Sequence, residues 1–259
     1  WKHWAKVWNV DFDWIQNRYD QTEYHDGKPM HTNGITVSRW VDGVLENPDR
    51  ISQRTALKAM FYWGHAVNSQ TRGPEMKKAM AKLDMMVVVD PYPTIAAVMH
   101  DRTDGVYLLP AATQFETTGS VTNSSRSLQW RDQVIEPMFE SKPDHEIMYL
   151  LSRKLGFADE LFRNIKVEGS VPVVEDITRE FNAGMWTVGY TAQSPERLKA
   201  HQKNWHTFDF ETLKARGGPA NGDFYGLPWP CWGTPEMGHP GSPILYDTSK
   251  TVAEGGGNF

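Results

Sequence analysis

Five consecutive apolar residues, Met85 to Val89, are followed directly by a charged one, Asp90. A short apolar run without alternation is typical of a strand that is buried on both faces, as in a parallel sheet. Open α/β sheets bind ligands at the carboxyl ends of their strands, and Asp90 would lie at such an end. The sequence therefore predicts an α/β fold with a parallel sheet and a ligand-binding edge at Asp90.

Elements of alternating type surround this run. Strands are predicted at 59–63, ending at Gly64, and at 106–109, with helices at 75–83 and 94–99 between the strands. Pro74 opens the first of these helices, where proline is best tolerated. The order strand, helix, strand, helix, strand predicts a parallel sheet with right-handed crossovers.

Outside the sheet the patterns are more varied. Helices are predicted at 144–155, closed by Gly156, and at 174–181, closed by Gly184, because apolar residues recur there at helical spacing. A short helix ending at Leu57 is expected after a cap at Asp49 or Ser52. Residues 118–127 are expected to form a long loop.

Three regions are predicted along the chain. Residues 1–57 form an irregular aromatic lead-in or insertion, residues 58–165 an α/β nucleotide-binding half-domain, and residues 166–259 a helical part followed by a Pro- and Gly-rich connection toward a C-terminal domain. Because the chain begins at Trp1 and ends on a Gly-rich stretch, we expect it to be part of a longer polypeptide.

Composition excludes several classes of protein. The hydrophobic share of 39% and the charged share of 23% are typical of a globular protein, and a net charge of -5 offers no footprint for nucleic acid. No stretch approaches the roughly 20 apolar residues of a membrane span. Cys231 is the single cysteine and makes no internal disulfide, and the eleven tryptophans indicate a core or a subunit interface.

Asp90 is the strongest candidate for a binding residue. A carboxylate accepts two parallel hydrogen bonds, and guanine presents N1–H and N2–H side by side. The alternative is that Asp90 caps the next helix, with Pro91 at its first position. Gly64 would allow a ligand to approach the backbone, although a simple tight turn explains Gly64 equally well. Asn68, Ser69 and Gln70 could meet a ribose or pyrophosphate.

A second group of polar residues follows the third predicted strand. Glu116, Gly119, Asn123 and Arg126 lie there, and Arg126 is a natural phosphate partner, although exposed arginines are mostly solvated. The sequence lacks GxGxxG, GxxxxGK[ST], HExxH and GxSxG patterns. Histidines such as His201 are therefore expected at the surface or in a polar core, and Cys231 has no neighbours that would activate it.

Several of these segments resemble one known family in the same order. The residues at 64–68, 87–96, 109–111, Glu116, Gly119, 122–123, Arg126 and Gln129 resemble the second dinucleotide-binding half of molybdopterin oxidoreductases. Together with residues 223–231 and 239–245, they make the chain from Trp40 to Phe259 similar to the catalytic α subunit of respiratory formate dehydrogenases.

The resemblance implies a molybdenum or tungsten enzyme that carries two molybdopterin guanine dinucleotides and oxidises formate to carbon dioxide. Asp90 would read guanine, and Thr94 would support that contact. The implied cofactor-binding residues are Gly64, His65, Asn68, Asp90, Thr94, Pro110, Glu116, Gly119, Asn123 and Arg126. Catalytic and metal-ligating residues are expected to be absent from this chain.

Important parts of such an enzyme lie outside these residues. The resemblance implies cysteines for a 4Fe-4S cluster, a selenocysteine or cysteine metal ligand with a neighbouring histidine, and an active-site arginine elsewhere in the polypeptide. This segment alone is therefore expected to be inactive. The implied partners are the rest of the same subunit, an iron–sulfur electron-transfer subunit and a membrane cytochrome b subunit, and the implied location is the periplasm.

Three other functions remain open at this level. Another molybdopterin oxidoreductase, of the nitrate, arsenate or polysulfide reductase type, would share the same segments. A nucleotide-binding module without redox activity would need only the Asp90 sheet, and an interaction segment would explain the tryptophans without any cofactor.

Overall fold

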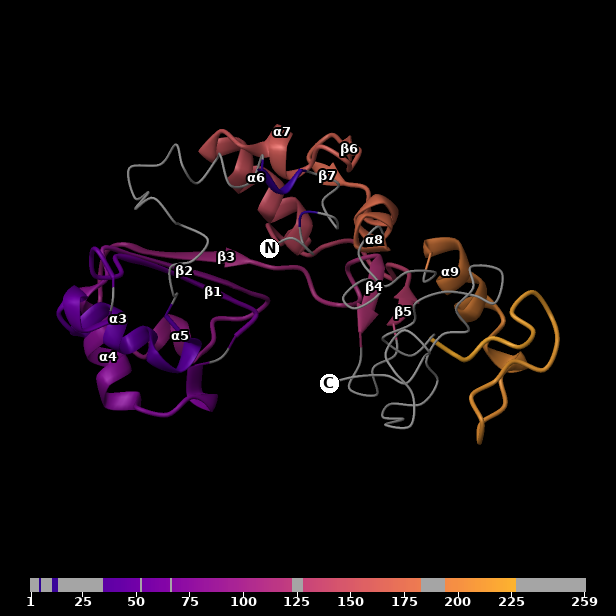
Figure 1. Cartoon of the computed structure of the whole chain (residues 1–259), viewed down its shortest axis with the longest axis horizontal. Coiled ribbons are helices and arrows are strands. Elements are labelled where there is room, and N and C mark those ends of the chain that lie inside the picture. The colour runs from indigo at the N-terminus through magenta and orange to yellow at the C-terminus, as the bar shows by residue number, and fades with distance from the viewer. Residues whose placement is uncertain are drawn as a thin grey trace. The chain divides into compact units, whose positions relative to one another are not determined.

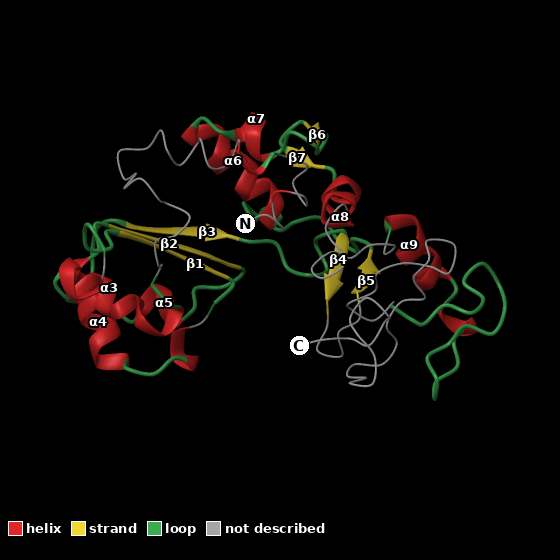
Figure 2. Ribbon diagram, viewed as in Figure 1, coloured by secondary structure: helices red, strands yellow, loops and turns green. Residues whose placement is uncertain are grey.

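The computed structural model of the protein describes residues 5, 11–13, 35–51, 53–65, 67–122, 128–182 and 194–226. These belong to two compact units, which Figures 1 and 2 show with their elements. Residues 18–116 and 136–147 make up the unit that we call the sheet unit, and residues 1–17, 117–135 and 148–259 make up the hairpin unit. Each unit is described by itself.

The sheet unit contains a parallel sheet of three strands in the order β1-β2-β3. The strands are β1 (Ala59–Trp63), β2 (Met85–Asp90) and β3 (Val106–Pro110). Helix α4 (Gly73–Lys82) connects β1 to β2, and α5 (Ile95–Val98) connects β2 to β3. The predicted parallel α/β sheet is thereby confirmed, with element bounds that differ by only a few residues.

The apolar run in β2 is buried as predicted. Met86 and Val89 are fully buried, and Val87 and Val88 are 5% and 3% exposed. Helices α3 (Trp40–Leu45), α4 and α5 lie on one face of the sheet (Figure 2). There Tyr62, Met86 and Val88 pack against Trp40 and Met80, so this face carries the core of the unit.

The predicted helix through Leu57 is wrong. A short 3₁₀ helix, Pro48–Ile51, ends well before Leu57, and Ser52 lies outside the described residues. The backbone N–H of Leu57 donates to the Gly43 carbonyl at 2.8 Å, and the Leu57 side chain packs against the core. Tertiary packing against α3, which the sequence analysis did not predict, therefore overrides the local helical preference.

Arg102 holds the end of α4 in place. Its guanidinium donates to the carbonyl oxygens of Met80 at 2.9 Å and Asp84 at 3.1 Å, and also to that of Leu83. These oxygens lie in the last turn of the helix or just beyond it, where carbonyl groups have no intrahelical partner. One side chain from the α5–β3 connection thus provides hydrogen-bond donors for the backbone carbonyl oxygens of the α4–β2 connection.

The carboxyl end of β3 is extended by a further short segment. Lys142 forms a parallel bridge with Ala111, and its N–H donates to the Pro110 carbonyl at 3.1 Å. Helix α6 (Asp144–Leu155) begins just after this bridge, and the Trp63 indole N–H donates to the Asp144 carboxylate at 2.8 Å. This helix was predicted with the same bounds.

The hairpin unit is built on β4 (Gly119–Thr122) and β5 (Leu128–Arg131), which pair antiparallel. The loop predicted at 118–127 is therefore wrong for 119–122, and residues 123–127 lie outside the described ones. Leu128 and Trp130 alternate into a small core with Leu198. The strands are only four residues long, so their alternation is too short to predict strands from the sequence.

Helices flank this hairpin. Helix α8 (Val174–Asn182) lies against β4 and α9 (Pro195–Lys203) against β5. The first was predicted at 174–181, while α9 was not predicted; Gly184 lies outside the described residues. The remaining elements are the helix α7 (Ala158–Leu161), the strands β6 (Val167–Glu168) and β7 (Val171–Pro172), and the 3₁₀ helices Val37–Arg39, Val67–Ser69 and Trp205–Thr207.

The predicted region boundaries at 57 and 165 stay predictions. Among the described residues, no helix is long and apolar enough to cross a membrane.

Gly105 gives a test of the α5–β3 connection. Its φ is 62°, and a Cβ there would lie 2.6 Å from the Asp84 carbonyl oxygen and 2.5 Å from Arg102 Nη2. We expect Gly105→Ala to lower the free energy of unfolding by about 2 kcal/mol or more, because the left-handed backbone alone costs about 1–2 kcal/mol. Urea denaturation of the full-length protein, followed by tryptophan fluorescence, measures this loss.

Gly156→Ala is the matched control. Gly156 also has a positive φ, 83°, but a Cβ there would meet no atom within 4 Å. It should therefore cost only the backbone term, about 1–2 kcal/mol. Equal losses for the two variants would contradict the steric argument at Gly105.

Candidate functional site

The carboxyl edge of the parallel sheet brings three predicted site residues onto neighbouring strands. Pro110 on β3 lies opposite Asp90 on β2, and Trp63 on β1 lies opposite Val89. The Gly64 N–H continues this ladder by donating to the Val89 carbonyl at 2.9 Å. Gly64, Asp90 and Pro110 therefore share one edge, as the sequence predicted.

Asp90 does not cap the next helix. Helix α5 begins only at Ile95, with Thr94 as its N-cap residue, so Pro91 is not the first helical residue. The Asp90 carboxylate accepts one long hydrogen bond, at 3.4 Å, from the backbone N–H of Tyr92. The alternative role of Asp90 as a helix cap is thereby removed, and most of its hydrogen-bonding capacity remains for a ligand.

Thr94 carries an unsatisfied polar atom near this edge. Its Oγ1 is buried and has no hydrogen-bond partner in the described part of the chain, although Thr94 stands at an N-cap position. Buried hydroxyls are normally hydrogen-bonded, because leaving one unpaired costs free energy. The contact of Thr94 with a cofactor stays a prediction.

Gly64 leaves open space at the end of β1. Its φ is 58°, and a Cβ at this position would meet no atom within 4 Å. The positive φ explains why glycine stands here, since other residues adopt it only at a cost. Both readings of Gly64 remain compatible with this geometry, because a tight turn can also leave room for a ligand.

His65 and Asn68 follow in the same connection. His65 is exposed, and its Nε2 lies 2.9 Å from Gln70 Nε2. Gln70 in turn accepts a hydrogen bond from the Trp40 indole N–H at 3.0 Å. Asn68 lies in the 3₁₀ helix Val67–Ser69.

Glu116 is engaged within its own loop. The side chain is 4% exposed, and its carboxylate accepts hydrogen bonds from the backbone N–H groups of Thr113 at 2.6 Å and Met138 at 2.8 Å. These bonds, first those from Thr113 and then the one from Met138, hold the pKa of Glu116 below its usual value. Glu116 thus joins two segments of the sheet unit, and its contact with a cofactor stays a prediction.

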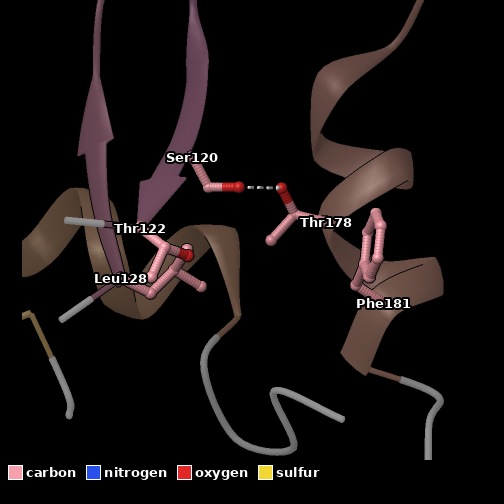
Figure 3. A pocket seen from close by; sticks show the side chains of 5 residues that line it. All are labelled: Ser120, Thr122, Leu128, Thr178 and Phe181. Atoms are coloured by element: carbon pink, nitrogen blue, oxygen red, sulfur yellow. Dashed lines mark hydrogen bonds between the residues drawn. The ribbon is translucent and has the colours of Figure 1, made fainter. Parts of the chain in front are cut away.

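The other predicted residues belong to the hairpin unit. Gly119 begins β4, and Asn123 and Arg126 lie outside the described residues. A cavity of about 200 Å³ opens beside β4, lined by Ser120, Thr122, Leu128, Thr178 and Phe181 (Figure 3).

The hydroxyls of this cavity are largely used inside the protein. Ser120 Oγ and Thr178 Oγ1 lie 3.2 Å apart, as the dashed line in Figure 3 shows, and Thr178 also donates to the Val174 carbonyl at 3.1 Å. Leu128 and Phe181 make the rest of the wall apolar. We therefore interpret the cavity as a packing space between the hairpin and α8.

The hairpin unit contains a charged cluster that was not predicted from the sequence. Asp223 accepts hydrogen bonds from Arg197 Nε at 2.8 Å and Nη2 at 2.5 Å, and lies 2.9 Å from His201 Nε2. Burial raises the pKa of Asp223, but the bonds from His201 and Arg197 outweigh it and hold that pKa far below its usual range. His201 is 2% exposed, so the prediction of a polar-core histidine is confirmed. His201 and Asp223 are 22 positions apart in the sequence, so no local pattern indicates this cluster.

Among the described residues, no group of three or more His, Cys, Asp or Glu side chains could hold a metal ion. Cys231 lies outside those residues.

Comparison with known proteins gives one family match. The model of the family described as Molybdopterin oxidoreductase matches residues 23–154, about half of the chain. This range includes all three strands of the parallel sheet.

The curated relatives have low sequence identity to this chain. A candidate formate dehydrogenase of Staphylococcus aureus is 30% identical over 160 residues, which are 58% of this chain and 15% of that protein. One of Staphylococcus haemolyticus is 27% identical over 150 residues, 54% of this chain and 14% of that protein. The chain thus spans only about a seventh of the length of these relatives.

Solved structures are similar as well. Acetylene hydratase from Pelobacter acetylenicus aligns with a TM-score of 0.44 and 17% sequence identity, over 83% of this chain and 26% of that one.

The hydrogen bonds that the Glu116 carboxylate accepts predict a pH dependence of stability. Its folded pKa is lowered, so its contribution is present above the unfolded glutamate pKa of about 4.3 and is lost as the pH falls through the folded pKa. Glu116→Gln should lower the melting temperature of the full-length protein at pH 7, and the difference from wild type should shrink toward low pH. Scanning calorimetry from pH 7 to pH 3 measures both effects.

Glu136→Gln is the control, because Glu136 is an exposed glutamate of the same unit. It should melt as wild type does at every pH. A Glu116→Gln deficit that stayed constant down to pH 3 would show that the carboxylate charge is not the stabilising feature.

Proposed function

Because this chain belongs to the molybdopterin oxidoreductase family, we propose that it is part of the catalytic subunit of a formate dehydrogenase. The family implies a molybdopterin-type cofactor with its metal. We propose the finer assignment as well: formate is oxidised to carbon dioxide at a molybdenum or tungsten centre held by two molybdopterin guanine dinucleotides. The identity to candidate formate dehydrogenases supports this choice of substrate.

The observation that carries the cofactor assignment is the polar edge of the parallel sheet. Asp90 retains acceptor capacity, Thr94 Oγ1 is buried without a partner, and Gly64 leaves open space on the adjacent strand. Guanine N1–H and N2–H are donors that suit a carboxylate, and a base beside Asp90 would also give Thr94 a partner. The residues present therefore fit a guanine nucleotide.

In this proposal the residues of the chain bind and orient the cofactor tail rather than react. When bound, the metal centre accepts the two electrons of formate oxidation. Asp90 accepts hydrogen bonds from the guanine base, Thr94 supports that contact, and Gly64 allows the close approach. Held by fixed strand ends, the tail keeps the rest of the cofactor in one orientation.

The same proposal includes the wider assembly. The metal ligand, whether selenocysteine or cysteine, and the 4Fe-4S cluster would be supplied by other parts of the same catalytic subunit. Electrons would leave through an iron–sulfur subunit, with a membrane cytochrome b subunit as the further partner. We propose the periplasm as the location, following the respiratory enzymes that the sequence resembles.

Asp90 gives the direct test of guanine binding. In the full-length enzyme, Asp90→Asn should weaken retention of the guanine dinucleotide about tenfold or more, because a charge-assisted hydrogen bond contributes about 1.5–3 kcal/mol. The variant also turns an amide N–H toward the donors of guanine. The measurement is the guanine nucleotide and the metal released per mole of purified protein.

Asp104→Asn serves as the matched control, since Asp104 is an exposed aspartate of the same unit. It should retain wild-type guanine and metal content. If Asp90→Asn retained as much of both as this control, Asp90 would not be the guanine reader.

Substrate class is tested with the full-length enzyme. We expect formate to reduce an artificial electron acceptor, with molybdenum or tungsten present near one atom per catalytic subunit. Nitrate, arsenate and polysulfide should be turned over at least about a hundredfold more slowly, since discrimination of that size needs only about 3 kcal/mol. Efficient nitrate reduction without formate oxidation would assign the chain to another branch of the family, and a preparation free of pterin and metal would refute the oxidoreductase function.

A further inference from the structure

A chain of three polar side chains runs from the core of the sheet unit to its ligand-binding edge. The Trp40 indole N–H donates to Gln70 Oε1 at 3.0 Å, and Gln70 Nε2 lies 2.9 Å from His65 Nε2. Trp40 is 6% exposed and packs edge-on against Tyr62, with ring centroids 6.1 Å apart. The inner end of the chain is therefore held in one orientation.

The chemistry of these groups fixes the direction of every hydrogen bond. An indole N–H can only donate, so the Gln70 amide must turn its oxygen toward Trp40. Its NH₂ group then faces His65 and can only donate. His65 Nε2 must accept this bond, so its ring proton resides on Nδ1.

The position of His65 would allow this Nδ1–H group to donate to a ligand at the edge of the sheet. His65 follows Gly64, which the sheet register places beside Asp90 on the next strand. Within the described part of the chain, His65 Nδ1 makes no hydrogen bond, and the residue is exposed. A donor that follows the end of β1 thus belongs to the same edge of the sheet as the acceptor at the end of β2.

Guanine presents the matching pattern. Its Watson–Crick edge carries two donors, N1–H and N2–H, followed by one acceptor, O6. A carboxylate satisfies the two donors but cannot satisfy O6, which needs an N–H or O–H group. Adenine carries an amino donor in place of O6, so a fixed N–H here would oppose it.

We infer that Trp40 and Gln70 are positioning residues that hold the proton of His65 on Nδ1, and that this N–H donates to O6 of the guanine bound by Asp90. The inference rests on the proposed function and deepens it. It makes His65 a specificity-determining residue of the nucleotide site. Trp40, which lies in the core, acts on the His65 tautomer through Gln70 and not by contact with the ligand. No step of the redox reaction passes through these three residues.

The first experiment measures nucleotide retention in the full-length holoenzyme with two variants of similar shape. In His65→Asn the amide nitrogen can replace the Nδ1 donor, whereas His65→Leu has no donor. We expect guanine dinucleotide to dissociate in mild denaturant about fivefold to tenfold faster from His65→Leu than from wild type, the effect of one hydrogen bond. His65→Asn should stay within about twofold of wild type.

The second experiment reads the ring proton directly. Holoenzyme labelled with ¹⁵N histidine, compared with labelled His65→Asn holoenzyme, isolates the ¹⁵N signals of His65. We expect the shifts of a ring protonated on Nδ1. Trp40→Phe keeps an aromatic ring in the core but releases the Gln70 amide, so it should yield a mixture of both tautomers and dissociation rates between wild type and His65→Leu.

These outcomes separate the inference from the proposed function. Equal dissociation rates for wild type, His65→Asn and His65→Leu would overturn the inference while guanine binding stands. A His65 ring protonated on Nε2 in the wild-type enzyme would also overturn it. A holoenzyme that releases no guanine nucleotide would refute the proposed function, and the inference with it.

Discussion

The parallel pairing of β2 with strands on both sides is the constraint on which the sheet unit depends. An interior strand of this kind cannot tolerate polar side chains along its length, because both of its faces are covered. The first polar residue can appear only where the strand leaves the sheet, and in this chain that residue is Asp90. The same pairing places Gly64 and Pro110 beside it. One strand register thus both forms the core and places the candidate binding residues.

Sequence patterns predicted the elements of the sheet because each has a strong local signal. The apolar run of β2, Pro74 at the start of α4 and the helical spacing in α6 all depend on neighbouring residues. Weak or competing local signals produced the errors. The four-residue strands β4 and β5 are too short for a clear alternation, and Leu57 is drawn to α3 by packing that no local pattern contains.

In the candidate site, too, some features could be predicted from local sequence signals and others could not. Residues fixed by strand ends could be identified from the sequence, and the choice between a helix cap and a free carboxylate at Asp90 required the position of α5. Contacts between distant residues could not be predicted. Trp40 and Gln70 are 30 residues apart, and Glu116 reaches Met138 across 22 residues. Only the folded chain brings such pairs together, so their hydrogen bonds cannot be predicted from neighbouring residues.

Arg102 has a consequence for how this unit opens. Its guanidinium binds carbonyl oxygens at the end of α4 and just before β2, while its backbone belongs to the segment that leads into β3. Fraying of the α5–β3 connection would remove the Arg102 donor from these carbonyl oxygens, and fraying of the α4–β2 connection would leave Arg102 without its acceptors. The two connections should therefore exchange their amide protons together, as one cooperative block. Both connections lie at the amino ends of the strands, opposite the edge that carries Asp90. Flexibility needed for loading a ligand can therefore be confined to one end of the sheet while the other stays closed.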